Sequence, residues 1–519
     1  MNNSFLHGLM SFPNINGPSD DSVMNIEKNG KNTVDKDVQV DFNSLNWLKV
    51  RKSRFKEGFL FTNDYGNWLF LDGGEYKQIL FGNISSGLFK KLEENMMILT
   101  GNTEQKISER INDFYWYLNK GTTLHIVIPT LRCNFTCKYC YALRAPEDAF
   151  DRDMTPENMD KTIDFILDGP AGSVVIEFSG GEPLIRFDLL KRAILRAEDV
   201  AIRKNKEVFF SLISNGSLLT DEIIDFFYKH KVGICLSLDG PKGLHDSNRK
   251  LTASLGGNSN TYDLVAEKFA LLKKHNYPGI NALPVIVRDS LPLWKEIVDE
   301  YVKFGIKNLR FKYISNFGFA SSRWNEMSYS PDEYLRSWKK VIDYMIELNK
   351  AGVEIAENVA TIILKKILLK ENPGYAELQI PCGAVIGQTV YDYSGSIYTC
   401  DEARTMPDFK IGTVGDSKYK DLLEHPVAKS MLSVSNLTGS CDECTWFSFC
   451  GICPLEIYNK EKGFITNIPS NYRCKIHKGM FEYLFEKIIF DAEAKKILEK
   501  WVNIEIQAKA DNCSRWNSC

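Results

Sequence analysis

Three closely spaced cysteines constrain this chain more than any other feature. They are Cys133, Cys137 and Cys140, in the run Arg132-Cys-Asn-Phe-Thr-Cys-Lys-Tyr-Cys140, with the spacing C-x3-C-x2-C. Such a loop can bind three irons of a four-iron cubane and leave the fourth iron open for a small molecule. A structural zinc site usually needs four protein ligands, and the nearest histidine, His125, lies on the preceding apolar run. An odd number of cysteines also argues against disulfides.

The composition favours metal binding inside the cell over other classes of function. The chain has 519 residues, which is enough for two or three domains. Its net charge is −3 and its pI is about 6.2, so no basic surface for nucleic acid is indicated. No apolar run reaches the ~20 residues of a membrane span, and the N-terminus lacks the pattern of a signal peptide. We therefore expect a cytoplasmic protein whose 13 cysteines bind metal.

The N-terminal part divides into a tail and a small unit. Residues 1–43 are polar and lack apolar periodicity, which predicts a mobile tail. Residues 44–120 are expected to form an α+β unit. Two apolar runs within residues 59–71 flank a turn-forming segment and predict a β-hairpin, and helical spacing follows at 75–81 and 86–97. This order of elements resembles a winged-helix domain that takes up a peptide. The alternative is that the aromatic residues of 59–71 pack against the expected barrel.

From residue 121 to about 352, apolar runs alternate with helical segments. This alternation indicates a parallel sheet. Six units rather than eight predict an α/β fold of the partial (β/α)6 barrel type, with its chemistry at the carboxyl ends of the strands. The alternative is a plain α/β domain with structural cysteines. The expected strands are 124–129, 174–178, 208–214, 233–238, 280–287 and 309–314, and the expected helices are 155–168, 187–204, 221–230, 262–275, 291–304 and 331–350.

Polar and glycine-rich runs follow the second, third and fourth of these strands. The run Ser-Gly-Gly-Glu-Pro combines glycines that allow close backbone approach with a carboxylate that can accept from an ammonium group. Together with the cysteine loop, these runs resemble the radical S-adenosylmethionine (SAM) superfamily. The residues that the resemblance places around SAM are Tyr139, Gly180, Gly181, Glu182, Ser214, Asn215, Ser237 and Arg249.

The resemblance implies a cofactor and a chemistry. Three thiolates would hold a 4Fe-4S cluster whose open iron chelates SAM, and Glu182 would bind the SAM amino group. Reductive cleavage of SAM would give a 5′-deoxyadenosyl radical that abstracts hydrogen from an unactivated C–H bond. Ser237 and Arg249 would touch SAM, as in the branch that modifies peptides and sulfatases. Their ordinary alternatives are a strand-end hydrogen bond and a surface salt bridge.

A second group of seven cysteines lies between residues 382 and 474, in a segment that we expect to form a domain over 353–480. Its C-x2-C-x5-C-x2-C block resembles the SPASM extension, which carries two auxiliary 4Fe-4S clusters, although the last gap of that family's block has three residues. By this resemblance Cys441, Cys444, Cys450 and Cys474 hold the outer cluster. The inner cluster would be held by Cys382, Cys400 and Cys453.

The resemblance leaves the inner cluster one cysteine short. Either it keeps an open site, or Glu377 or another group completes it. Two zinc sites are the alternative for the whole field. Among the remaining cysteines, Cys235 is expected in the core, whereas Cys513 and Cys519 fall in the expected C-terminal helix and tail, 481–519.

Asp401 follows Cys400 directly. A carboxylate in this position is the catalytic base of anaerobic sulfatase maturases, so the resemblance implies that role here. The alternative is a carboxylate that is hydrogen-bonded near a cluster.

Within the superfamily, the runs at 60–71, 124–134 and 176–184 resemble the His-Xaa-Ser-system maturases, over most of residues 55–480. The resemblance implies an oxidoreductase that crosslinks or oxidises a small ribosomally made precursor peptide. It also implies an electron donor such as flavodoxin or ferredoxin. The alternatives are an anaerobic sulfatase maturase, which forms formylglycine, and a non-catalytic scaffold that binds a peptide and keeps its clusters for structure.

Overall fold

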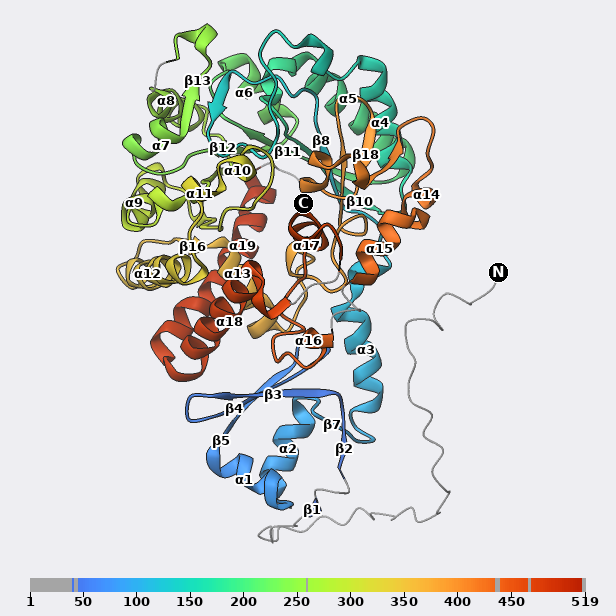
Figure 1. Ribbon diagram of the computed structural model, residues 1–519, viewed down its shortest axis with the longest axis vertical. Helices are drawn as coiled ribbons and strands as arrows, with labels where there is room; N and C mark the ends of the chain where they lie inside the picture. The colour runs from blue at the N-terminus through green and yellow to red at the C-terminus, as the bar shows by residue number, and fades with distance from the viewer. Residues whose placement is uncertain (1–39, 42–44, 258–259, 435–438, 465–467, 516–519) are drawn as a thin grey trace.

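The computed structural model describes residues 40–41, 45–257, 260–434, 439–464 and 468–515. The molecule is elongated, with an α/β region at one end and a small N-terminal unit at the other (Figure 1). No helix among these residues is long and apolar enough to cross a membrane. The expected mobile tail lies outside the described residues, apart from the two-residue strand β1 (Val40–Asp41).

An eight-stranded sheet forms the centre of the α/β region. Its order is β14-β12-β11-β10-β8-β17-β18-β19. The pairs from β14 to β17 are parallel, and the two pairs from β17 to β19 are antiparallel. The strands are β8 (Leu124–Val127), β10 (Ser173–Phe178), β11 (Glu207–Ser214), β12 (Val232–Ser237), β14 (Ile280–Leu283), β17 (Gln388–Tyr391), β18 (Ser396–Tyr398) and β19 (Lys410–Thr413).

Helices cover the sheet, and their ends follow sequence signals. The hydroxyl of Thr155 accepts from the backbone N–H of Asn158 and caps α4, and a capping box of Ser330 and Glu333 opens α12. The expected helices are confirmed to within three residues, and α7 is additional. The helices are α4 (Pro156–Asp168), α5 (Phe187–Lys204), α6 (Asp221–Lys229), α7 (Lys242–Asn248), α8 (Thr261–Lys274), α9 (Trp294–Phe304) and α12 (Pro331–Lys350).

The expected sixth barrel strand, 309–314, does not form as one regular strand. Only β15 (Asn308–Leu309) forms, and it pairs with β16 (Ala356–Glu357) instead of the main sheet. After β15, backbone N–H groups donate to side chains. The N–H of Phe311 donates to the Glu357 carboxylate at 3.0 Å, and the N–H of Ile314 donates to the Tyr329 hydroxyl at 2.9 Å. Because side chains satisfy these donors, the segment keeps, among the described residues, only one bridge to the expected fifth strand, a parallel pairing of Ile286 with Tyr313.

The N-terminal unit is built on a three-stranded antiparallel sheet, with β4 between β3 and β5. β4 and β5 confirm the expected hairpin, whereas β3 was not expected. The elements are β2 (Asn46–Trp47), β3 (Val50–Phe55), β4 (Gly58–Asn63), β5 (Trp68–Asp72), α1 (Gly73–Phe81), β6 (Asn83–Ile84), α2 (Ser86–Glu94), β7 (Ile98–Leu99) and α3 (Glu104–Phe114).

The C-terminal region contacts this unit. The indole N–H of Trp68 donates to the carbonyl of Ile367 at 2.7 Å, and its ring meets Phe485 edge-on. The expected domain boundary at residue 480 lies inside α18. The further helices are α10 (Phe319–Ser322), α11 (Trp324–Met327), α13 (Asn358–Leu364), α14 (Tyr419–Glu424), α15 (Pro426–Val434), α16 (Gly439–Asp442), α17 (Pro454–Glu461), α18 (Tyr472–Phe490) and α19 (Ala492–Arg515).

The loops that leave β8 and β10 approach each other closely at Gly181. A Cβ atom on this residue would lie 2.2 Å from the carbonyl oxygen of Arg132. We expect Gly181→Ala to lower the free energy of unfolding by about 1–3 kcal/mol, because backbone on both sides must move. The measurement is the thermal unfolding midpoint. Gly87→Ala on α2 is the control, because no atom lies within 4 Å of its Cβ position; equal midpoints for the two variants would contradict this reading.

Candidate functional site

The cysteine loop lies at the carboxyl end of β8, where the barrel interpretation expects a site. Its short strand β9 (Phe135–Cys137) pairs antiparallel with β13 (Arg249–Leu251), and Arg249 lies opposite Cys137. Cys133 is buried, while Cys137 and Cys140 are half-buried. The N–H of Phe135 donates to the Cys133 sulfur at 3.4 Å. The loop therefore presents its thiols from a backbone that two strands hold in place.

Backbone and side-chain contacts join this loop to the glycine loop after β10. The N–H of Glu182 donates to the carbonyl of Arg132 at 2.8 Å. The Arg132 guanidinium in turn donates to both oxygens of Asp153, at 2.8 and 2.6 Å. Gly180 adopts a φ of +122°, which a side chain rarely allows. The two loops thus form one packed layer above the sheet.

Glu182 is fully buried and accepts hydrogen bonds from residues at the end of β11. Its carboxylate accepts from the Ser214 hydroxyl at 2.8 Å, from the N–H of Asn215 at 2.8 Å and from the N–H of Leu184 at 3.1 Å. Burial raises the pKa of Glu182 to about 7, against the lowering effect of these hydrogen bonds. Three predicted residues are therefore in contact. Because the carboxylate is already occupied by protein donors, its contact with SAM stays a prediction.

The side chain of Asn215 extends this cluster to the cysteine loop. Its amide group donates to the side-chain oxygen of Asn134 at 2.8 Å and lies 4.0 Å from the Cys133 sulfur. Asn134 sits between the first two cysteines, yet residue spacing alone did not single it out. Its position next to a strand-end asparagine appears only in the fold.

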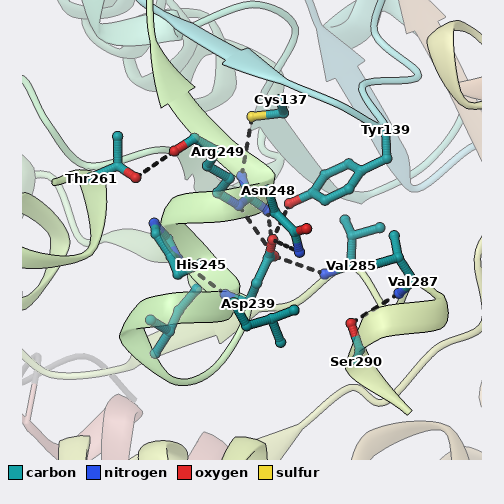
Figure 2. A network of polar contacts seen from close by, with 12 residues as sticks. Cys137, Tyr139, Asp239, His245, Asn248, Arg249, Thr261, Val285, Val287 and Ser290 are labelled. Atoms are coloured by element: carbon teal, nitrogen blue, oxygen red, sulfur yellow. Dashed lines mark hydrogen bonds and ion pairs between the residues drawn. The ribbon is translucent and has the colours of Figure 1, made fainter. Parts of the chain in front are cut away.

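A second buried network surrounds Asp239, and Figure 2 shows its members. The Asp239 carboxylate accepts from the Arg249 guanidinium at 3.0 and 3.2 Å, from the Asn248 amide at 3.0 Å and from the Tyr139 hydroxyl. Arg249 also places Nη1 4.0 Å from the Cys137 sulfur. The predicted residues Tyr139 and Arg249 thus share one partner. Ser237 lies two residues before Asp239, half-buried at the end of β12.

The charges in this network oppose one another. Burial acts to raise the pKa of Asp239, but the Arg249 guanidinium and its other partners hold that pKa below the ordinary value. Burial raises the pKa of Cys137 to about 12; Arg249 acts against this rise, and Asp239 adds to it. Asp239 was not selected from the sequence, although it directly follows the expected strand 233–238.

The seven C-terminal cysteines fall into two neighbourhoods. Burial raises the pKa of Cys450 above its ordinary value, and the nearby thiols of Cys444, Cys474 and Cys441 raise it further. These four cysteines line one pocket together with Trp446, Phe447 and Ile457. This is the set that the sequence resemblance assigned to an outer cluster. Cys453 also borders the pocket.

The other neighbourhood contains Cys382, Cys400 and Cys453. Burial raises the pKa of Cys400, and the charges of Glu402, Cys382 and Cys453 raise it further. This is the set that the resemblance assigned to an inner cluster. Glu402 was not selected from the sequence. Its carboxylate raises the pKa of the Cys400 thiol more than any other charged group does.

Glu377, the other candidate ligand of the inner cluster, is engaged by cations. Lys312 donates to its carboxylate, and Arg473 and Arg310 lie at 3.6 Å. Burial acts to raise the pKa of Glu377, but these cations hold it well below the ordinary value. By contrast, burial and the charge of Glu377 raise the pKa of Glu402.

Asp401 connects the two cysteine fields. The hydroxyl of Tyr141, the residue after Cys140, donates to the Asp401 carboxylate, and Arg404 lies at 3.4 Å from it. Arg404 also donates to the carbonyl of Ala142 at 2.8 Å. The predicted residue is therefore hydrogen-bonded beside the cysteine loop, and its role as a base stays a prediction. Tyr141 was not identified from the sequence.

Cys235 lies on β12 and is half-buried. Burial raises its pKa to about 12, and the carboxyl of Glu177 on β10 raises it further. Glu177 accepts from the Ser211 hydroxyl at 3.1 Å. Burial and the nearby Asp401 raise the pKa of Glu177 to about 7. Polar groups therefore extend along this face of the sheet.

The donor groups fit a cofactor that binds through thiolates. The N–H groups of Phe135, Asn215 and Arg249 point at the sulfurs of Cys133 and Cys137, and such donors stabilise sulfur ligands that carry negative charge. No group of three or more cysteine, histidine or carboxylate side chains is placed to hold a single metal ion within the part of the chain that the structure describes. A cubane differs from a single ion because each thiolate binds a different iron.

Comparison with known proteins places this site in a family. Residues 127–303 match the radical SAM superfamily. The cysteine-type anaerobic sulfatase-maturating enzyme of Clostridium perfringens strain 13 is 25% identical over 365 residues, which cover 69% of this chain and 94% of the relative. The radical SAM cyclopropyl synthase TigE of Paramaledivibacter caminithermalis is 23% identical over 465 residues, or 85% of this chain and 88% of TigE.

A solved structure has a similar fold. Native anSMEcpe with bound AdoMet and the Kp18Cys peptide superposes with a TM-score of 0.60 and 22% identity, over 73% of this chain and 99% of that chain. The matched family segment contains the cysteine loop, Glu182 and the Asp239 network. Residues 127–303 therefore belong to the radical SAM superfamily.

Proposed function

We propose that this chain is a radical SAM oxidoreductase that modifies a ribosomally synthesised peptide by C–H abstraction. One observation carries the proposal. The thiols of Cys133, Cys137 and Cys140, the buried Glu182 and the Arg249 guanidinium come together at the carboxyl ends of neighbouring strands, inside the matched segment. A non-catalytic scaffold would not require this combination.

The three thiols would hold a 4Fe-4S cluster with SAM beside it. When bound, this pair supplies a 5′-deoxyadenosyl radical that abstracts hydrogen from an unactivated C–H bond. The residues of the chain orient and shield it. Glu182 ties β10 to β11 beneath the loop, and Asp239 fixes Tyr139 and Arg249 against it. A site built on strand ends in this way is held more rigidly than one on free loops.

The C-terminal cysteines would hold two auxiliary 4Fe-4S clusters. Their separation into a set of four and a set of three supports this assignment. For the inner set, Glu402 is a better candidate than Glu377 for the missing ligand, because Glu377 is already bound by three cations. Asp401 would accept a proton from the substrate, with Tyr141 and Arg404 holding its carboxylate in place.

The substrate we propose is a small precursor peptide, of the kind that accompanies His-Xaa-Ser-system maturases. The peptide bound in the similar anSMEcpe structure supports a peptide partner. A second function, formylglycine formation on a sulfatase, is favoured by the match to the Clostridium perfringens enzyme. Incubation with the peptide encoded next to this chain and, separately, with a sulfatase-derived peptide would distinguish the two by product mass. An electron donor such as flavodoxin or ferredoxin would complete either system.

Peptide uptake could involve the N-terminal unit, and its structure favours one surface. One side of its sheet packs on the C-terminal region, through Trp68 and through Arg51, which lies 4.3 Å above the Phe447 ring. On β3, an edge strand of the three-stranded sheet, Lys52 and Arg54 are exposed. An extended peptide can add to such an edge as a further strand.

The first test concerns the cysteine loop. We expect the triple change of Cys133, Cys137 and Cys140 to Ala to abolish the formation of 5′-deoxyadenosine from SAM under strong reductant, because no ligand would remain for the SAM-binding cluster. The auxiliary clusters should stay in place, and their visible absorbance provides the control. If the triple variant still forms 5′-deoxyadenosine, the assignment of this loop is wrong.

The second test counts the clusters. Anaerobic reconstitution should give about twelve irons and about twelve sulfides per chain, the stoichiometry of three cubanes. Changing Cys441 and Cys444 to Ala should remove about four irons, because it deletes half of the outer set. Elemental analysis with zinc included makes the measurement. About four irons with bound zinc in the unmodified protein would refute the auxiliary clusters.

The third test concerns peptide binding at β3. We expect the double change Lys52→Glu and Arg54→Glu to weaken binding of the neighbouring precursor peptide by roughly tenfold, as loss of part of an edge-strand interface would. A fluorescence titration measures the affinity. The double change Lys273→Glu and Lys274→Glu, at the exposed end of α8, is the matched control. Equal affinities for both variants would mean that β3 is not the recognition edge.

A further inference from the structure

The Arg249 guanidinium lies between a buried carboxylate and a thiol of the cysteine loop (Figure 2). Nε and Nη2 donate to one oxygen of Asp239 at 3.2 and 3.0 Å, and Nη1 points to the Cys137 sulfur at 4.0 Å. The pairing of β9 with β13 sets this geometry, because it places Arg249 directly opposite Cys137. The planar guanidinium thus presents donors on two sides.

Asp239 cannot follow Arg249 away from this position, because other groups fix its carboxylate. The Asn248 amide donates to one oxygen at 3.0 Å, and the N–H of Val285 donates to the other at 3.1 Å. The Tyr139 hydroxyl donates as well. The backbone N–H of Asp239 donates to the His245 ring at 3.3 Å, which holds the main chain (Figure 2). Arg249 is therefore attached to a rigid anchor.

The contact with Cys137 differs in charge from the contacts of the neighbouring thiol. Cys133 receives neutral donors, the N–H of Phe135 at 3.4 Å and the Asn215 amide at 4.0 Å. Cys137 faces a full positive charge that is always present at physiological pH. Hydrogen bonds to sulfur and net charge near a cluster are main determinants of its reduction potential.

We propose that Arg249 is a charged hydrogen-bond donor to the Cys137 thiolate and raises the reduction potential of the cluster on this loop. Asp239 is the positioning residue that holds Arg249 there. This inference rests on the proposed function, because it requires a cluster on the three cysteines. It gives Arg249 a role that operates before SAM binds, in contrast to the SAM contact expected from the sequence.

The two charges predict opposite shifts. Arg249→Gln removes a positive charge, so the equilibrium constant for reduction should fall at least tenfold, which is 59 mV for a one-electron couple. Asp239→Asn removes a negative charge and keeps an oxygen acceptor for Arg249, so the potential should rise. Arg249→Lys keeps the charge but loses the fork geometry. Its reduction potential should therefore lie between those of the unmodified protein and Arg249→Gln.

The measurement is a redox titration of the reconstituted full-length protein without SAM, followed by electron paramagnetic resonance. The triple cysteine variant supplies the background of any other clusters. Arg196→Gln is the matched control. The Arg196 guanidinium also donates to a carboxylate, that of Asp164, at 2.9 and 2.5 Å, but this pair joins the outer helices α5 and α4. We expect the equilibrium constant for reduction of this variant to stay within about twofold of that of the unmodified protein.

Two results would overturn the inference. One is an Arg249→Gln protein with an unchanged SAM-free potential but weaker SAM binding, which would make Arg249 a SAM contact alone. The other is an Asp239→Asn protein whose potential is unchanged or lower. This second variant and Arg249→Lys decide the question even if Arg249→Gln loses its iron. A protein that shows the predicted shifts but does not cleave SAM would disprove the proposed function instead.

Discussion

Continuation of the sheet's hydrogen bonding beyond the strands holds the candidate site together. After β8 and β10 end, the N–H of Ser179 still donates to Val127, that of Gly181 to Thr130 and that of Glu182 to Arg132, at 3.1, 2.9 and 2.8 Å. The hydrogen-bond register of the sheet therefore continues into the two loops. The thiols and the Glu182 carboxyl are positioned by a ladder that reaches the site itself.

The same sheet joins the two cysteine fields. β17 runs parallel to β8 on the side opposite β10, and the chain continues through β18 to Cys400 and Asp401. The Tyr141 hydroxyl then reaches the Asp401 carboxylate. The segment that leads to Cys400 and Asp401 is thus part of the main sheet, and its distance from the cysteine loop is set by strand pairing rather than by a linker.

Local patterns predicted the parts of the molecule that are local. The cysteine spacing, the glycine run before Glu182 and the amphipathic helices could be recognised because each depends on neighbours in the sequence. Asp239 and Tyr141 could not, because their partners Arg249 and Asp401 are brought to them by the fold. The sixth strand failed for a related reason: Glu357 and Tyr329, distant in sequence, satisfy the backbone that an adjacent strand would otherwise pair with.

The central place of β8 has a consequence for the order of events during synthesis. β8 pairs with β10 soon after both emerge, but its other neighbour, β17, follows about 260 residues later. At ribosomal rates of 5–20 residues per second, this interval is about 13–50 s. Throughout it, the edge of β8 is unpaired and the cysteine loop lacks its cover from Asp401 and Arg404. The nascent chain therefore passes through an interval in which the cysteine loop is more open than in the complete fold.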